Sequence, residues 1–515
     1  MVTSRSSAKG SSAKGSSAEG SSDKRRRPPA RQTQKPPDPA RFAALRILRA
    51  VEEDDAYANL VSGQILDDMH LEGRDAAFAL NLAYGVLRWQ GLLDAIWRRC
   101  TQRSEVDSDV QRVLRLGTHQ LLQMQVPAHA AIATSVDLIR CAGSPGAAGF
   151  VNAVLRAVQV ESLPGWLGQL GLQESTDSAD QPQLDIECLA LRWSHPIWIV
   201  EAFADALGSD RAELPALLAA DNEPPRPVLV ALPGLAEAAE LRQDRRTSPG
   251  AISPLAAVLN EGRPDELLAV RQGRAAVQDE GSQLAALVLS RAPILGSESA
   301  WLDLCAGPGG KAAVLAGLAA ERGIEFIAVE PQPARARLLR RRLEPFVQAS
   351  TASRLAPPAP RVLLGDGRHA PWGQMRFSRI LVDAPCSGIG SLRRRPEARW
   401  RRSPDDLATL VQLQRELLDT AIRSTSDGGV VLYVTCSPHH RETVEVIEHA
   451  LQTFGDAVRA LETTALIPEL QLPPAKSVQL WPHRHGTDAM FMAALQIVTA
   501  VPTIGETQAG GQGAH

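Results

Sequence analysis

The sequence has 515 residues, of which 44% are hydrophobic, 22% charged and 4% aromatic, and its net charge is -3. At about 100 to 200 residues per domain, this length predicts roughly two to four domains. We expect neither a membrane-spanning nor a secreted protein, because the sequence has no run of about 18 apolar residues and no charged start before an apolar core. The six cysteines form no Cys-x-x-Cys pair, so we expect neither a metal site nor a disulfide framework. Free thiols are typical of a protein of the reducing cytoplasm, which is the location that we expect.

The N-terminal region, residues 1–38, repeats Ser-Ser-Ala-Lys-Gly and then runs through Lys-Arg-Arg-Arg into a Pro-rich stretch. Residues 1–41 hold ten basic side chains against three acidic ones. A segment with so few large apolar residues cannot bury enough surface to fold. We therefore expect a disordered basic tail, which is either simply solvated or an arm attracted to phosphate groups.

A helical pattern follows from residue 39 to residue 167, where apolar residues recur three and four positions apart, as in Phe78, Leu82 and Val86. This spacing predicts an all-α domain. Residues 168–185 turn polar and acidic, which is typical of a linker. Residues 186–274 mix a helical pattern near 198–207 with a possible strand at 227–232, so we expect a small α+β connecting domain.

From residue 275 to residue 498, apolar strand-like runs alternate with helical ones, which predicts an α/β Rossmann-like domain with a parallel sheet. We expect residues 499–515 to be a loop-like tail. The expected strands are 301–305, 326–330, 361–364, 379–382 and 430–434, with 490–497 as a late edge strand.

A glycine-rich turn, Asp-Leu-Cys-Ala-Gly-Pro-Gly-Gly-Lys at 303–311, follows the first of these strands. It lets a ligand approach the backbone and the start of a helix. It is not a Walker A loop, because Cys305 stands where that loop needs Gly and Ala312 where it needs Ser or Thr. Glu330 and Asp366, after the next two strands, can bond a ribose diol and an adenine amino group, which favours S-adenosyl-L-methionine. The expected cofactor residues are Cys305, Ala306, Gly307, Pro308, Gly309, Gly310, Lys311, Glu330, Asp366 and Asp383.

Two cysteines follow neighbouring strands, in Asp-Ala-Pro-Cys at 383–386 and Thr-Cys-Ser at 435–437. Because the carboxyl ends of parallel strands share one edge, we expect Cys386 and Cys436 to face the methyl donor. C5 of cytosine needs activation before it accepts a methyl group, and a thiolate that adds to C6 supplies it. A base must later remove the C5 proton, and Asp383 near N3 would support the charge on the ring.

These three motifs together resemble those of the RNA cytosine-5 methyltransferases. The resemblance implies that Cys436 is the nucleophile and that Cys386 assists product release, whereas the DNA enzymes attack with the other cysteine. Arg-Asp-Ala at 74–76, Tyr-Gly-Val-Leu-Arg at 84–88 and the helix at 150–156 resemble the NusB fold, which implies an RNA-binding domain. The connecting region, with Ser-His-Pro at 194–196 and Asn-Glu-Pro-Pro at 222–225, resembles that of one bacterial subfamily, the 16S ribosomal RNA methyltransferases called RsmB or Sun. The family's usual Asp-Gly-Phe-Phe is replaced here by Asp488, Ala489, Met490 and Phe491.

The resemblance implies that the partner is 16S ribosomal RNA or a small-subunit assembly intermediate. It also implies that the protein is a monomer. Two alternatives stay open, namely the same chemistry on transfer RNA and a non-catalytic RNA-binding or antitermination factor. The run 393–402, with six arginines and Trp400, suits phosphate contacts and base stacking, or is a solvated charged face. Arg335 and the arginines after it are expected to be the solvated face of a helix.

Overall fold

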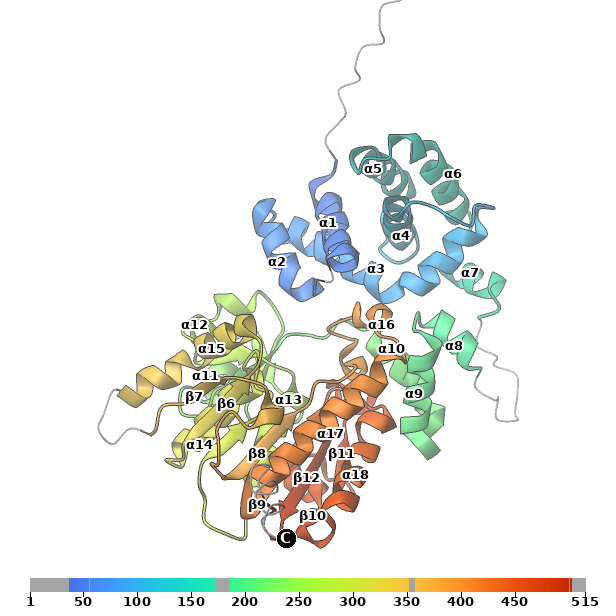
Figure 1. Ribbon diagram of the computed structural model, residues 1–515. Helices are drawn as coiled ribbons and strands as arrows, with labels where there is room; N and C mark the ends of the chain where they lie inside the picture. Colours follow the sequence, from blue (N-terminus) through green and yellow to red (C-terminus); the bar gives the residue numbers. More distant parts are fainter. Residues whose placement is uncertain (1–36, 55, 173–184, 352–356, 500, 503–515) are drawn as a thin grey trace, which may run out of the picture. The chain divides into compact units, whose positions relative to one another are not determined.

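The computed structural model describes residues 37–54, 56–172, 185–351, 357–499 and 501–502 (Figure 1). The expected N-terminal tail, most of the expected linker and most of the expected C-terminal tail lie outside the described residues. None of the helices in the described part of the chain is long and apolar enough to span a bilayer.

The first described region is all-helical, as predicted. Its helix α1 begins at a Pro after Asp38, whose carboxylate accepts a hydrogen bond from the backbone N of Arg41 at 2.9 Å, a favourable N-cap. Apolar stripes on the helices bury Leu45, Leu82 and Leu114 in one core. The elements are α1 (Pro39–Glu53), α2 (Ala58–Asp68), α3 (Gly73–Arg99), α4 (Ser108–Leu122), α5 (Ala128–Cys141), α6 (Ala148–Val158) and α7 (Leu163–Gln169).

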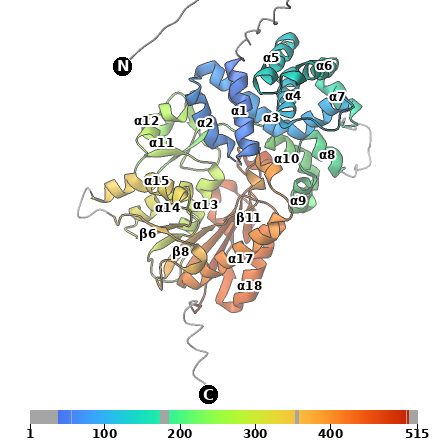
Figure 2. The ribbon, with the colours of Figure 1, turned by 45° about the horizontal axis from the view of Figure 1, so that its top comes forward.

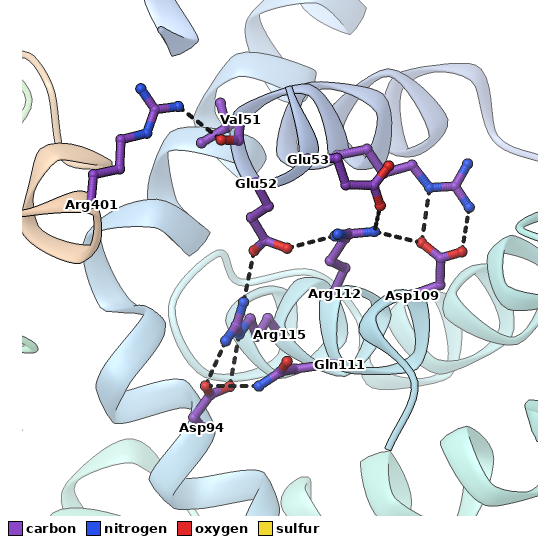
Figure 3. A network of polar contacts seen from close by, with 10 residues as sticks. Val51, Glu52, Glu53, Asp94, Asp109, Gln111, Arg112, Arg115 and Arg401 are labelled. Atoms are coloured by element: carbon purple, nitrogen blue, oxygen red, sulfur yellow. Dashed lines mark hydrogen bonds and ion pairs between the residues drawn. The ribbon is translucent and has the colours of Figure 1, made fainter. Parts of the chain in front are cut away.

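A charged network ties α1, α3 and α4 together (Figure 3). Arg112 of α4 bonds Glu52 of α1 at 2.6 Å, and Arg115 bonds Asp94 of α3 at 2.7 Å as well as Glu52 at 2.9 Å. Both arginines are buried. A buried charge is costly without partners, so the two arginines of α4 depend on the carboxylates that α1 and α3 supply.

The connecting region contains a helical part and a small antiparallel sheet of order β2-β3-β1-β4. The pairing of β4 with β1 extends this sheet into residues 275–277, the start of the range expected for the α/β domain. The helical part packs against residues of the α/β region, among them Ile389 and Trp481. The elements are α8 (Ile186–Arg192), α9 (Ile197–Leu207), α10 (Leu214–Asp221), β1 (Val228–Ala231), α11 (Ala238–Arg242), β2 (Thr247–Pro249), β3 (Ala256–Leu259), α12 (Leu268–Arg271) and β4 (Ala275–Val277).

The α/β region has helices on both faces of a main sheet of order β10-β12-β9-β8-β5-β6-β7, with β11 paired to β12. Strands β5 to β9 are mutually parallel where they pair. The apolar cluster that includes α13, α14 and α15 covers one face, and the cluster that includes α17 and α18 covers the other (Figures 1 and 2). The strands are β5 (Trp301–Asp303), β6 (Phe326–Glu330), β7 (Arg361–Leu364), β8 (Phe377–Asp383), β9 (Thr425–Thr435), β10 (Val458–Ala460), β11 (Ser477–Gln479) and β12 (Phe491–Ile497).

Helices α14, α15 and α17 connect β5 to β6, β6 to β7 and β8 to β9, as crossover helices do, whereas the residues that the structure describes between β7 and β8 form a short 3-10 turn and no α-helix. The loop after β5 leads directly into α14, and the connection after β8 contains the short α16. The helices are α13 (Glu280–Arg291), α14 (Gly310–Glu321), α15 (Pro333–Thr351), α16 (Ala398–Arg401), α17 (Asp406–Ser424), α18 (Val444–Phe454) and α19 (Pro482–His485).

The prediction of an edge strand at 490–497 is wrong. Strand β12 lies inside the sheet, antiparallel to both β9 and β10, and all of its residues are buried. Its nearly continuous apolar run is typical of a strand covered on both faces. The strand therefore lies next to β9, which leads into the Thr-Cys-Ser motif, and is not the edge of the sheet.

Candidate active site

The carboxyl ends of the parallel strands bring the predicted functional residues to one edge of the sheet. Asp303, Glu330 and Asp383 end β5, β6 and β8, and Cys436 directly follows β9. This is the edge at which doubly wound sheets bind their ligands.

The glycine-rich loop passes close over Glu330. A Cβ added at Gly307 would lie 2.0 Å from Glu330 Oε2, so a larger residue there would have to displace the Glu330 carboxylate. Gly309 has a φ of 111°, a left-handed conformation that glycine adopts without strain, and α14 begins at the next residue. The loop thus forms a narrow cradle between a helix N-terminus and a carboxylate, which is suited to a nucleoside ligand.

Glu330 is buried at the bottom of this cradle. Its Oε1 accepts a hydrogen bond from the backbone N of Gln332 at 2.9 Å, and its Oε2 lies 3.6 Å from Arg335 Nε. Arg335 also donates to the carbonyl oxygen of Gly307. Arg335 is exposed on α15, as expected of a solvated helix face, but its guanidinium also joins the loop to Glu330.

Asp366 lies after β7 and caps a short turn. Its carboxylate accepts from the backbone N of Arg368 at 3.0 Å and pairs with the Arg368 guanidinium at 2.7 Å. The hydrogen bond from that guanidinium lowers the pKa of Asp366. Any hydrogen bond to an adenine amino group would have to use the oxygen lone pairs that Arg368 leaves open.

Lys311 and Asp383 form an ion pair between the loop and β8, with Lys311 Nζ 2.9 Å from each carboxylate oxygen. Burial alone would lower the pKa of Lys311, but the charge of Asp383 and the hydrogen bond to it raise that pKa. Asp303, which sequence reasoning left unassigned, is buried beside them. Burial, helped by the charge of Asp383, raises the pKa of Asp303 to about 8.

Cys386 and Cys436 lie together as expected, with their Sγ atoms 3.4 Å apart. The hydrogen bond from Cys386 lowers the pKa of Cys436 against the opposing effect of burial, and the charge of Lys311 lowers it further. The same hydrogen bond and burial raise the pKa of Cys386 well above its usual value. Because the thiolate is the nucleophile, Cys436 is the better attacking group and Cys386 the better proton carrier.

Cys305 differs from this pair. Its thiol lies in the loop over β5, where its backbone N donates to Asp303 Oδ1 at 3.3 Å. Burial first, and then the neighbouring carboxylates, raise the pKa of Cys305 well above its usual value. It is therefore a poor nucleophile, in keeping with a place in the binding loop.

The segment that departs from the family pattern packs against the cysteine loops. The backbone N of Ala489 donates to the carbonyl oxygen of Gly390 at 2.8 Å, and that of Gly390 donates to the carbonyl oxygen of Cys436 at 2.9 Å. Asp488 pairs with Arg394. These contacts use the backbone or Asp488, so the replacement of the usual Gly-Phe leaves them intact.

The interpretation of the arginine run as an RNA surface is wrong for Arg399, and so is that of a solvated face. Arg399 has 0% exposure, and its guanidinium donates to the carbonyl oxygens of Arg88 and Ser194 at 2.9 and 3.2 Å. Trp400 Nε1 donates to the carbonyl oxygen of Leu87 at 3.3 Å. Sequence reasoning missed these partners because they lie between 205 and 313 residues away along the chain.

The sheet, the glycine-rich loop with its following carboxylate and the paired thiols are together characteristic of the S-adenosylmethionine-dependent RNA methyltransferases. The family model described as 16S rRNA methyltransferase RsmB/F matches residues 294–496, and the NusB family model matches residues 38–160. The chain belongs to the RsmB/F family of methyltransferases, with a NusB domain at its N-terminal side, which confirms the predicted family and fold class.

Relatives match nearly their whole length. Rv1407 of Mycobacterium tuberculosis, named only as a methyltransferase, is 48% identical over 90% of this chain and 98% of its own. Ribosomal RNA small subunit methyltransferase B of Pseudomonas putida is 32% identical over 89% of this chain and 99% of its own. The crystal structure of PH0851 has the same fold, with a TM-score of 0.69 and 22% identity over 90% of this chain and 99% of that one.

Proposed function

We propose that the protein methylates C5 of a cytosine in 16S ribosomal RNA through a covalent adduct between Cys436 and C6. The observation that carries this proposal is the pair of thiols 3.4 Å apart beside the glycine-rich loop, with the pKa of one lowered and that of the other raised. Both thiols must stay reduced for this chemistry, so we place the reaction in the cytoplasm.

Cys436 begins the reaction as a thiolate. Its sulfur forms a bond to C6 of the cytosine, and the electron pair of the C5–C6 double bond moves to C5, which becomes nucleophilic. Asp383, held by Lys311, would lie near N3 and support the charge that develops on the ring. The target base leaves its stack to reach the thiols, which favours a loop as substrate.

The residues of the cradle would hold S-adenosyl-L-methionine, with Glu330 on the ribose diol, Asp366 at the adenine and the 305–311 loop along the rest of the molecule. When bound, this cofactor supplies an electrophilic methyl group to C5. Arg335 keeps the loop against Glu330, and the Lys311–Asp383 ion pair joins the same loop to the end of β8.

Cys386 completes the reaction. A base must take the proton from the methylated C5 so that the C5–C6 double bond re-forms and the sulfur of Cys436 leaves C6. We assign the assistance of this release to Cys386, whose thiol lies next to the departing sulfur. A general acid–base group at hydrogen-bond distance suits this role.

The choice of 16S ribosomal RNA rests on the family and on the relative from Pseudomonas putida, which is named for the small-subunit RNA. Bisulfite sequencing of total RNA from cells with and without the gene tests the choice. We expect one small-subunit cytosine to lose its protection when the gene is absent. Loss in transfer RNA instead would leave the chemistry standing with another substrate, and no loss anywhere would favour a non-catalytic RNA-binding protein.

A further inference from the structure

A buried carboxylate is hydrogen-bonded to the residue that follows Cys386 and, through it, to the residue that follows Cys436. Glu442, in the short turn His440–Glu442 after β9, has 0% exposure. Its Oε1 accepts a hydrogen bond from the backbone N of Ser387 at 2.8 Å, and its Oε2 accepts one from Ser387 Oγ at 2.5 Å. The Glu442 carboxylate therefore binds both the backbone and the side chain of the residue after Cys386.

The same carboxylate reaches the other cysteine motif through Ser387. The hydroxyl oxygens of Ser387 and Ser437 lie 3.1 Å apart. A hydroxyl has a single hydrogen, and that of Ser387 is directed at Glu442, so the hydroxyl of Ser437 is the donor of this second bond. The residues that follow Cys386 and Cys436 are thus joined in one hydrogen-bond chain that ends on Glu442.

Two further contacts fix the position of Glu442. Gln414 of α17 donates from Nε2 to Glu442 Oε1 at 3.0 Å and to the carbonyl oxygen of Pro385 at 2.8 Å. The hydroxyl of Tyr433, in β9, donates to the backbone carbonyl oxygen of Glu442 at 2.8 Å. Because all these groups are buried, breaking the chain leaves polar atoms without partners and the loops free to separate.

We propose that Glu442 is a positioning residue that holds the Cys386 and Cys436 loops together, so that the two thiols stay within reach of each other and of one cytosine. This inference rests on the proposed function for its kinetic consequence. Its geometric consequence, the proximity of the two sulfur atoms, does not depend on any RNA substrate.

The kinetic test compares Glu442→Ala with Glu442→Gln. A glutamine keeps an oxygen that accepts from the backbone N of Ser387, and its amide nitrogen can donate to Ser387 Oγ. The hydroxyl of Ser387 can then donate to Ser437. The hydrogen-bond chain is therefore kept, with the direction of its side-chain bonds reversed. We expect kcat to fall about 100-fold in E442A and to stay within about fivefold of the original in E442Q, since a displacement of about 1 Å has such an effect. The dissociation constant of S-adenosylmethionine should stay within about twofold, because Glu442 is outside the cofactor cradle.

The geometric test measures how fast diamide joins Cys386 to Cys436, without RNA or cofactor. The two thiols lose two electrons and two protons to diamide, which becomes a hydrazine, and mass spectrometry of the linked peptides reports the disulfide. We expect the linkage to form about tenfold more slowly in E442A than in the original protein and in E442Q. The control is Glu298→Ala, which removes a carboxylate bonded to Trp301 and Arg379 before the start of β5, and should leave the linkage rate unchanged.

If E442A does not fold, Ser437→Ala replaces it, because it breaks the link between the loops and leaves Glu442 bound to Ser387. The proposal is overturned if E442A or S437A keeps the original linkage rate, or if E442Q is as slow as E442A. Absence of RNA methylation by the original protein would overturn the proposed function alone, since the linkage rates would still be compared.

Discussion

The connection between β8 and α17 contains two stretches whose side chains have different partners. Residues 384–391 bring Cys386 to Cys436 and are held by groups of the catalytic region, among them Glu442. Residues 397–402 instead contact the N-terminal helical region and the connecting region, mainly through Arg399, Trp400 and Arg401. One connection therefore carries both the chemistry and the attachment of the other regions.

The second stretch is bound by backbone carbonyls more than by opposite charges. Arg399 donates to the carbonyl oxygens of Arg88, Ser194 and Asp221, and Asn222 Oδ1 accepts from it at 2.7 Å. Burial lowers the pKa of Arg399 to about 9, although the charge of Asp221 opposes this effect.

The Arg401 guanidinium joins the same stretch to the first helix. It reaches the carbonyl oxygen of Val51 near the end of α1, where Figure 3 shows it next to the network of Glu52 and Arg112. The comparison shows that the NusB domain is hydrogen-bonded to the same connection that contains Cys386. Its link to the rest of the protein is therefore more than the covalent chain.

Replacing the proposed nucleophile, Cys436, tests the stretch that brings the two cysteines together, and it has the largest expected effect. In Cys436→Ala, methyl transfer to RNA should fall by about 10⁴-fold or more, because no other group can form the bond to C6. Tritium transfer from labelled S-adenosylmethionine to RNA measures this. Cys141→Ala, at the end of α5, is the matched control and should keep full transfer, whereas substantial activity in C436A would exclude the covalent mechanism.

Removing the second thiol separates the two roles within the first stretch. In Cys386→Ala, turnover should fall by about 10²-fold or more, since proton transfer during release loses its assistance. The protein should accumulate joined to RNA, visible as a band that resists denaturing electrophoresis. Rapid turnover without such a band would show that Cys386 has no part in release.

Replacing the buried arginine tests the docking stretch. Arg399→Met leaves the carbonyl oxygens of Arg88, Ser194 and Asp221 without their donor, so the free energy of unfolding should fall by about 3 kcal/mol. Arg402→Met, in the same run, should change it by no more than about 0.5 kcal/mol. Urea unfolding measures both variants, and equal losses would mean that Arg399 does not attach the regions.

The smallest expected effect concerns the influence of the Lys311 charge on the pKa of Cys436. The charge of Lys311 lowers the pKa of Cys436, so in Lys311→Met this pKa should rise and the alkylation of Cys436 by iodoacetamide should reach half its maximal rate at a higher pH. Lys476→Met, at an exposed position, should leave the profile unchanged. A profile that stays in place or moves to lower pH in K311M would contradict the assigned role of Lys311.

Sequence patterns predicted the elements whose signals are local. The apolar runs of β5 to β9 and the glycine-rich loop are continuous in the chain, and parallel order then brings Glu330, Cys386 and Cys436 to one edge. The same patterns misplaced β12, because an apolar run reveals burial on both faces but not which strands are its neighbours.

Other parts of the site depend on partners far away in the chain. Glu442 bonds Ser387 across 55 positions, and Arg399 bonds Arg88 across 311. No local pattern marks either residue, since a lone Glu in a turn and an Arg in a basic run are ordinarily solvated. Only the folded arrangement shows that both are buried.

The most direct test of the covalent mechanism identifies the residue that becomes joined to RNA. Cys386→Ala protein is incubated with 16S ribosomal RNA and S-adenosylmethionine and digested with nuclease and protease, and its peptides are examined by mass spectrometry. We expect a methylated cytidine on the peptide that contains Cys436. A nucleotide on any other residue, or methyl transfer by this variant without a covalent peptide, would contradict the assignment of Cys436 as the nucleophile.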